Sequence, residues 1–455
     1  MKSKDLCYDF AAMTTATGVG VAKTSLVRAM NRWDLAALAI NGIIGAGIFG
    51  LPSTAAAMLG AASPIAFILC SIIVYVFVLC FAEVASQFRE TGGPYLYART
   101  IFGSFIGFEV GWSAWVARLS AFAANSNVLI AYLGFFVPQV TSGLPRAAVM
   151  IAVTAALAVI NIRGIRGSAQ VSDIFAAAKI FGLVLFGAIG LFFVNWTTFS
   201  TASVPSNANW GGAILLLIYA FTGFESAVIP AAEAKNPQSD MAWALILSLG
   251  ISVIIYLCVQ VVAFGTVPGL AASQRPLADA GRNFLGPIAG GVISLLACVS
   301  IVGNLSNIAI VCPRLTYAFS EQRDFPNLFG YLHPRFGTPV VSILFFAAIA
   351  SILAISGTFV LLVTVSVIAR LVNYAVTCLA LPILRKRTPE RSGFRIFLGP
   401  ACSILGIALC IWLGMQAAAR DILAFAMASA IGALFYFAGR RPGRTTRPFA
   451  PNLNR

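Results

Sequence analysis

The stretch Asn41-Gly42-Ile43-Ile44-Gly45-Ala46-Gly47-Ile48-Phe49-Gly50 lies inside a long apolar segment, residues 34–59, and it decides the fold. It holds four glycines within nine positions. Each glycine weakens a helix by about 1 kcal/mol relative to alanine, so the pattern predicts a broken helix rather than a continuous one. A break leaves backbone amides and carbonyls without helical partners.

A second apolar segment, residues 209–232, carries a similar interruption at Phe221-Thr222-Gly223-Phe224-Glu225. The two segments are the first and the sixth of the chain, so they occupy matching positions in two halves of five segments each. Matched broken segments indicate inverted repeats with a solute site at their interface near mid-membrane. The sequence therefore predicts a secondary transporter.

Composition supports a membrane protein. The 455 residues are 59% hydrophobic and only 10% charged, against roughly 25% charged in soluble domains. A spanning helix needs about 20 mostly apolar residues, and a lipid environment requires each backbone polar group to be paired within the helix. The fold class is thus an all-α membrane protein, with the lipid bilayer as its surroundings.

Windows of spanning length give twelve predicted transmembrane helices. Their ranges are 34–59, 63–84, 104–137, 144–162, 170–194, 209–232, 240–267, 287–318, 338–356, 358–384, 396–415 and 418–438.

The net charge of +15 has two explanations, nucleic-acid binding or membrane topology. The 30 Lys and Arg residues gather in alternate loops and both tails. The opposite loops hold only Arg146, Arg275, Arg282 and Arg420. Arg118, Lys179 and Arg370 lie deep within predicted segments. The positive-inside rule then predicts that both termini are cytoplasmic and that the chain resides in the plasma (inner) membrane. We expect no nucleic-acid partner, and no removable signal peptide in residues 1–32.

Soluble-enzyme and metal constellations are not indicated. The nine cysteines lie mostly inside apolar segments and show no paired metal spacing. The single histidine, His333, precedes Pro334 in a predicted inner loop, which leaves a histidine triad without a candidate in the membrane. Gly45-x-Gly47 follows no strand, and no Walker loop occurs. We expect no enzyme activity, no metal and no cofactor.

Several motifs together resemble the amino acid–polyamine–organocation superfamily over residues 34–415. They are Gly-Ile-Ile-Gly-Ala-Gly-Ile-Phe at 42–49, Thr-Gly-Gly-Pro-Tyr-Leu-Tyr-Ala-Arg at 91–99, Asn161-Ile162-Arg163-Gly164, Gly-Phe-Glu-Ser with Ala-Glu-Ala-Lys-Asn-Pro at 223–237, Gly337-Thr338-Pro339, and Leu384-Arg385-Lys386-Arg387. The resemblance implies the fold of the bacterial leucine transporter, with ten core helices in a 5+5 inverted repeat plus two peripheral helices. It also implies a substrate with an α-amino acid group.

The resulting division of the chain has five parts. They are a cytoplasmic tail at 1–33, a first repeat at 34–194, a second repeat at 209–384, peripheral helices at 396–438 and a second tail at 439–455. The predicted function is amino acid transport by alternating access, most simply coupled to a proton. An amino acid/amine exchanger, a permease-like sensor and a channel are the alternatives. The oligomeric state is not predicted.

The predicted substrate site lies at the two breaks. The amides of Ala46, Gly47 and Ile48, at the positive end of a half-helix, would bind the substrate carboxylate. The carbonyls of Ile43, Ile44 and Phe221 would bind its ammonium. The remaining site residues are Gly45, Thr222, Gly223 and Phe224. Close helix packing through small residues is the alternative explanation of the glycines.

The resemblance implies an aromatic gate in the sixth segment, which favours Phe221 or Tyr219. An aromatic side chain in a span more commonly faces lipid or core, and this alternative stays open.

Lys179 lies inside the fifth segment, where an ionisable side chain costs about 2.5–3.5 kcal/mol or more. In proton-coupled members of the superfamily, a lysine at the matching position places its ammonium where sodium-coupled relatives hold sodium. We therefore predict that Lys179 carries the coupling proton and contacts the carbonyls freed by the first break. The alternative is a lysine whose stem reaches back to the cytoplasmic interface.

Glu225 opens the second half of the sixth segment, where a helix N-terminus favours an ionised carboxylate. The resemblance implies a proton-sensing role, and the alternative is a carboxylate that caps the break. Arg118, in the third segment, would either discourage cationic substrates or pair with Glu109 or Glu225, and pairing is favoured.

Overall fold

The computed structural model describes residues 30–88, 92–164, 168–201, 204–229, 233–387 and 393–439, and only the backbone of 168–178 and 201. Most of the predicted tails, 1–29 and 440–455, and residues 388–392 of the basic loop therefore lie outside the described residues. Within the described ranges the chain is helical, and its only β pairing is an isolated bridge between Met30 and Ala234.

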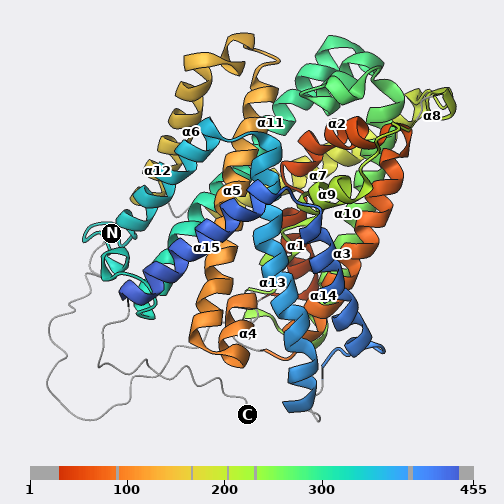
Figure 1. The fold of residues 1–455 in the computed structure, drawn as a ribbon. Coiled ribbons are helices and arrows are strands. Elements are labelled where there is room, and N and C mark those ends of the chain that lie inside the picture. Colours follow the sequence, from red (N-terminus) through yellow and green to blue (C-terminus); the bar gives the residue numbers. More distant parts are fainter. Residues whose placement is uncertain are drawn as a thin grey trace, which may run out of the picture.

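The described residues form fifteen α-helices (Figure 1). In chain order they are α1 (Arg32–Ile43), α2 (Gly47–Leu59), α3 (Ser63–Ser86), α4 (Gly93–Phe102), α5 (Ser104–Leu133), α6 (Gly143–Arg163), α7 (Ser168–Gly190), α8 (Thr197–Thr201), α9 (Trp210–Phe221), α10 (Pro237–Thr266), α11 (Pro276–Glu321), α12 (Val340–Ser356), α13 (Phe359–Arg387), α14 (Gly399–Met415) and α15 (Ala419–Gly439). Short 3₁₀ turns are η1 (Gly60–Ala62), η2 (Pro138–Thr141), η3 (Leu191–Phe193), η4 (Phe224–Ser226), η6 (Leu270–Ala272) and η7 (Asn327–Gly330).

Each of the twelve predicted segments coincides with one of these helices or with a pair of helical pieces. Among the described residues, seven stretches are long and apolar enough to cross a membrane. They are Gly47–Ser86, Ser104–Leu133, Gly143–Arg163, Pro237–Thr266, Pro276–Glu321, Phe359–Arg387 and Ala419–Gly439. Lys179–Phe193, Trp210–Ser226, Val340–Ser356 and Gly399–Met415 are apolar but shorter. The count of twelve spans and the inverted repeat stay predictions.

Three features of the helices were not predicted. Helix α4 lies near one end of the bundle and the short α8 near the opposite end (Figure 1). Helix α11 begins at Pro276, well before the predicted start of its segment, and it is kinked at Gly286. Gly286 has φ of 83°, a backbone conformation that glycine adopts without strain, and Pro287 follows it.

The start of α1 follows from local sequence. The side chain of Asn31 accepts from the amides of Trp33 and Asp34 at 2.8 and 3.2 Å, and Asp34 accepts from the amide of Asn31 at 2.8 Å. This reciprocal capping box satisfies amides that the first helical turn leaves free. The capping box therefore defines the N-terminus of α1. Its helical hydrogen bonds end at the glycine-rich stretch.

The centre of the bundle differs in exposure from its periphery. Every residue from Gly211 to Phe221 in α9 is buried, so this helix is apolar on all sides because it is surrounded by others. Helix α9 packs on α2, α3 and α13, and α1 packs on α10. The outer helices instead expose large apolar side chains, among them Ile72, Ile288 and Ile404. An uncovered apolar surface of this extent matches a protein embedded in lipid.

Candidate functional site

The break in the first segment is present where the sequence predicts it. Helix α1 ends at Ile43 and α2 begins at Gly47, which leaves residues 44–46 outside any helix. Ile44, with φ of −74° and ψ of 81°, turns the chain out of the helical path. All three residues are buried or half-buried, so their backbone groups need partners inside the protein.

The break in the second segment is also present. Helix α9 ends at Phe221, Thr222 is extended, and Gly223 has φ of 111°. This φ lies in the region that glycine occupies readily and other residues avoid. A single 3₁₀ turn, η4, follows it, and residues 230–232 of the predicted second half lie outside the described part of the chain.

The two breaks lie against one another, and glycine makes the approach possible. A Cβ placed on Gly47 would lie 2.9 Å from the Cα of Ala220, too close for any real contact. The backbone of Gly223 likewise lies against the carbonyl of Gly42. The glycines therefore also allow close packing of helices, which was the alternative explanation for them. Both features are present, because the helices are broken at the same glycines that pack closely.

Tyr256 of α10 joins the two breaks through one hydroxyl group. Its oxygen lies 2.9 Å from the carbonyl oxygen of Ile43 and 3.0 Å from that of Ala220. These carbonyls belong to the last turns of α1 and α9, which the breaks leave without helical donors. Tyr256 is fully buried, so its hydroxyl group holds the two helix ends at a fixed separation.

A small cavity of about 80 Å³ lies between the breaks. Its lining contains nine predicted site residues: Arg118, Tyr219, Thr222, Gly223, Glu225, Ile43, Gly45, Ala46 and Gly47. It also contains Gly42, Ala121, Asn125, Ser226, Asn304, Asn307, Ile308 and Arg370. The structure therefore brings most of the predicted residues to one place.

The amides predicted to bind a carboxylate have no hydrogen-bond partner in the described part of the chain. Among the described residues, no backbone hydrogen bond uses the amides of Ala46, Gly47 or Ile48. Ala46 is the N-cap of α2 and supplies no side-chain cap. Three buried donors at the positive end of a helix are suited to an anion, because an unpaired buried amide is costly and the helix dipole favours negative charge.

The carbonyls predicted to bind an ammonium are partly occupied, which corrects that assignment. Ile43 accepts from Tyr256 and also from the amide of Gly45 at 2.8 Å. Ile44 accepts from Lys179 at 2.5 Å. Of the three predicted carbonyls, only that of Phe221 accepts no hydrogen bond within the described chain.

Lys179 reaches the first break from α7. Its ammonium donates to the carbonyls of Asn41 at 2.9 Å and Ile44 at 2.5 Å, and the residue is 5% exposed. The predicted contact with the carbonyls of the break is thus confirmed. The alternative, a stem that carries the ammonium to the interface, is not what the structure contains.

The predicted gate requires a distinction between two aromatics. Tyr219 lines the cavity, and its hydroxyl donates to Oδ1 of Asn125 at 2.6 Å. Phe221 is fully buried, and its ring packs against Phe67 and Tyr256 away from the cavity lining. The core alternative therefore holds for Phe221, and Tyr219 is the remaining gate candidate.

Phe224 also belongs to the core rather than to the cavity wall. Its ring lies 5.2 Å from that of Phe81 and 5.5 Å from that of Tyr374, measured between centroids. Its place among the predicted site residues is corrected for the same reason as that of Phe221, because both rings pack against aromatic side chains and neither residue lines the cavity.

Glu225 pairs with Arg370 of α13, not with Arg118 as expected. Its other oxygen accepts from the amide of Gly223 at 2.8 Å, so it also caps the break. Arg118 takes part in none of the ion pairs of the described residues, and it donates to the carbonyl of Ala114 in its own helix at 3.1 Å. Two guanidinium groups and one carboxylate thus line the cavity.

Sequence reasoning did not assign four of the functional residues: Arg370, Asn125, Asn304 and Tyr256. The amide of Asn125 donates to Oδ1 of Asn304 at 2.8 Å, and this pair continues from the hydroxyl of Tyr219. A charged residue inside an apolar segment was the available signal for Arg370. Polar residues such as the asparagines are too common in spans to be selected without their neighbours in space.

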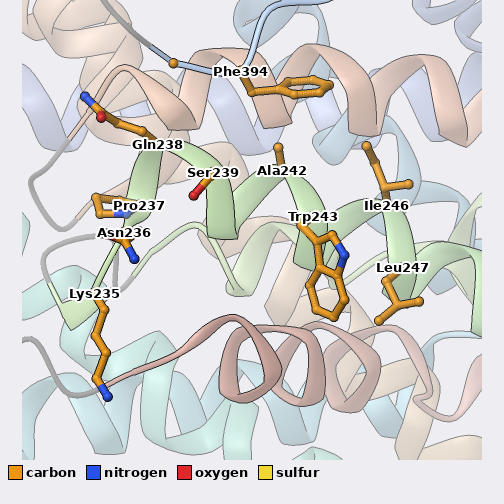
Figure 2. Close-up of a pocket in the computed structure, with 11 residues that line it drawn as sticks. Lys235, Asn236, Pro237, Gln238, Ser239, Ala242, Trp243, Ile246, Leu247 and Phe394 are labelled. Atoms are coloured by element: carbon orange, nitrogen blue, oxygen red, sulfur yellow. The ribbon is translucent and has the colours of Figure 1, made fainter.

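A second, larger pocket of about 810 Å³ lies beside α10 (Figure 2). Ala242 and Ile246 point toward the segment that carries Phe394, and Trp243 and Leu247 extend the apolar wall. None of the predicted site residues lines it. Lys235, Asn236, Gln238 and Ser239 also line it, but none of its lining residues belongs to either helix break, so its size does not make it the transport site.

Among the described residues, no group of histidine, cysteine or carboxylate side chains could hold a metal ion.

Comparison with known proteins gives consistent results over nearly the whole chain. The family model described as "Amino acid permease" matches residues 30–438. The methylthioribose transporter of Bacillus subtilis (strain 168) is 28% identical over 446 residues, covering 91% of this chain and 93% of that protein. The branched-chain amino acid permease BcaP of the same organism is 27% identical over 450 residues, covering 91% and 93%. Its serine/threonine exchanger SteT is 29% identical over 386 residues, covering 82% and 86%.

Proposed function

Because the chain belongs to the amino acid permease family, an integral membrane transporter family, we propose that it is a secondary carrier that moves amino acids by alternating access. The observation that supports this most directly is the set of three buried, unpartnered amides at Ala46, Gly47 and Ile48. They line or adjoin a cavity between two helix breaks. A carboxylate is the ligand such amides favour.

The substrate is proposed to lie across the two breaks as a zwitterion. Its carboxylate would accept from the amides at the start of α2. Its ammonium would donate to the carbonyl of Phe221 and to the oxygen atoms of nearby polar side chains such as Thr222, since the carbonyls of Ile43 and Ile44 have partners already. Tyr219 would cover the bound substrate.

Alternating access is proposed to move α1, α2, α3, α9, η4 and α10 together against the remaining helices. Contacts within this set support the grouping, since α10 packs on α1 and α3, and α9 packs on α2 and α3. The hydroxyl of Tyr256 links the ends of α1 and α9 inside the same set. The unpaired backbone groups at the two breaks would be open to only one side of the membrane in each state.

Proton coupling is proposed to use Lys179. Its ammonium bridges the carbonyls of Asn41 and Ile44, where a second positive charge would not fit. Loss of the proton would weaken those hydrogen bonds, because a neutral amine is a poorer donor than an ammonium. The rocking equilibrium would then shift by the difference in proton affinity between its two states. Glu225 is the second coupling candidate, and its pairing with Arg370 makes its charge part of the wall of the cavity.

Exchange is the second candidate function. A relative that covers 82% of this chain is named a serine/threonine exchanger. An exchanger and a proton symporter share the same cavity, and they differ in whether the empty carrier returns. A permease-like sensor and a channel remain further alternatives.

Both termini are proposed to be cytoplasmic, with the carrier in the plasma membrane. A cysteine introduced at Arg387, at the end of α13, would test this orientation with an impermeant thiol reagent in intact cells. The described native cysteines are buried or half-buried, so they give little background. No labelling is expected until the cells are permeabilised; labelling in intact cells contradicts the orientation.

Transport by the purified protein in proteoliposomes tests the function itself. We expect saturable uptake of a labelled amino acid that is accelerated by unlabelled amino acid inside, because counterflow requires a carrier that alternates. Binding without flux would indicate a sensor. Flux that neither saturates nor shows counterflow would indicate a channel.

A further inference from the structure

The cavity between the breaks holds more positive charge than one α-carboxylate needs. Arg118 and Arg370 both line it, and Glu225 is the one acidic residue among the lining residues. Glu225 pairs with Arg370, and that pair is approximately neutral. The charge of Arg118 is left without a counterion in the ion pairs of the described chain.

The hydrogen bonding of Arg118 is also incomplete. A guanidinium has five N–H donors in a planar fork. In the described residues only one of its donors has an acceptor, the carbonyl of Ala114 at 3.1 Å. Arg118 lies in the middle of α5, which is one of the helices long and apolar enough to cross a membrane. A charge held at that depth without a partner is costly, and a bound carboxylate would remove the cost.

The α-carboxylate of an amino acid does not fill this role, because the same cavity provides a separate site for it. The amides of Ala46, Gly47 and Ile48 are free to bind that group. The wall of the cavity therefore has two places for negative charge, one at the start of α2 and one at Arg118 of α5. A substrate that fills both has two carboxylates.

A third arginine lines a separate pocket beside the same helix, α2. This third pocket, of about 300 Å³, is lined by Gly50 of α2, Asn127 of α5 and Arg146 of α6, and by no acidic residue. Gly50 lies three residues beyond Gly47, about 4.5 Å further along the helix. Arg146 donates to Oδ1 of Asn127 at 2.5 Å and has no ion pair in the described chain. A pocket lined by positive charge and by no negative charge attracts anionic ligands.

We infer that the transported substrate is an α-amino acid with an anionic side chain, and that Arg118 binds its side-chain carboxylate. The inference rests on the proposed function and names the substrate class of the same site. Arg118 is a substrate-contacting residue on this assignment, and a bidentate guanidinium–carboxylate contact gives both affinity and orientation. Arg146 would gather the same anions before they enter.

The competing explanation is that Arg118 only repels cationic amino acids. Both explanations predict weak binding of arginine and lysine, so cationic substrates do not separate them. They differ for pairs of amino acids of equal size and different charge. Glutamate with glutamine, and aspartate with asparagine, are such pairs.

The deciding experiment uses the full-length protein in proteoliposomes, with counterflow of labelled L-glutamate, L-aspartate and L-leucine, each competed by glutamate, aspartate, glutamine, asparagine, leucine and arginine. We expect each acidic amino acid to compete at least about 30-fold better than its amide, the effect of losing one buried charge contact. If the amides or leucine compete equally well or better, the substrate class is wrong and the proposed function stands. If no amino acid shows counterflow, the proposed function itself is wrong.

Variants then locate the effect. Arg118→Gln should lower the kcat/KM for glutamate by about 30-fold and leave that for glutamine the same or higher, and Arg118→Lys should retain part of the preference for glutamate. The control is Arg282→Gln, which removes the same charge from an exposed position that lines neither pocket. An unaltered glutamate preference in Arg118→Gln would overturn the role of Arg118. The competition experiment with the wild-type protein tests the substrate class without any variant. It therefore remains decisive even if a variant misfolds.

Discussion

The ammonium of Lys179 lies 2.5 Å from the carbonyl oxygen of Ile44, the residue that follows the end of α1. One side chain of α7 thus occupies a backbone acceptor that the break has freed. The second acceptor, Asn41, lies one turn earlier in α1, so the ammonium takes the place of the helical donors that the break removes. The arrangement couples the charge of Lys179 to the geometry of α1.

Lys179→Ala is expected to remove the proton dependence of uptake. Wild-type uptake should need no sodium and should be faster with an inward proton gradient, because protonated Lys179 satisfies the two carbonyls. The variant should show slow uptake or exchange that is independent of pH. Uptake in proteoliposomes across a series of external pH values measures this, with sodium present and absent.

The matched control is Lys235→Ala, which removes an exposed lysine and should leave the pH profile unchanged. A strict requirement of wild-type uptake for a sodium gradient would contradict the role of Lys179. So would an unaltered pH profile in Lys179→Ala, and Glu225 would then be the better coupling candidate.

Tyr256→Phe is expected to destabilise the protein by about 1–3 kcal/mol, the cost of leaving a buried polar group without its partner. The hydroxyl is shared by the carbonyls of Ile43 and Ala220, so its loss also frees the two helix ends from each other. Thermal unfolding in detergent and substrate affinity should both decline.

Tyr436→Phe provides the comparison, because its buried hydroxyl bonds Ser104 away from the breaks. It should reduce stability without changing substrate affinity. Equal effects of the two variants on affinity would mean that Tyr256 acts only as a core residue.

The sequence predicted some features of this site and missed others for physical reasons. Glycine clusters and the cost of a buried ammonium are local properties, so both breaks and the contact of Lys179 with the first break were predictable. The pairing of Glu225 with Arg370 joins residues 145 positions apart, and nothing local distinguishes it from a pair with Arg118. The rings of Phe221 and Phe224 were misplaced because a break determines the backbone path and not the direction in which each side chain points.

The pair formed by Glu225 and Arg370 should show strong coupling in a double-mutant cycle. Arg370→Gln or Glu225→Gln alone leaves a buried charge without its partner, which costs about 3–5 kcal/mol. The double variant leaves no such charge, so it should be more stable than the sum of the single losses predicts. Chemical or thermal unfolding of the four proteins measures the coupling energy. Additive losses would show that Arg370 and Glu225 do not stabilise each other in the membrane.

Gly47→Ala should strongly weaken substrate binding while the protein still inserts and folds. Gly47→Leu should abolish binding. The new Cβ would lie 2.9 Å from the Cα of Ala220, and backbone at that distance cannot move aside as a flexible side chain can. The start of α2 must then shift away from α9, which moves the free amides of Ala46 and Ile48 out of the cavity. Anion binding by backbone amides depends on close approach, so a shift of about 1 Å is sufficient to lose it.

The matched control for this change is Gly250→Ala in α10, where a Cβ meets nothing within 4 Å. It should preserve binding and stabilise the helix by up to about 1 kcal/mol, since alanine is the better helix former. Isothermal titration of both purified variants with the transported amino acid measures the difference directly. Wild-type affinity in Gly47→Ala, with Gly250→Ala also unaffected, would show that the close contact between the two breaks is not needed for binding. The carboxylate would then have to bind elsewhere in the cavity, where Arg118 is a lining group able to hold it.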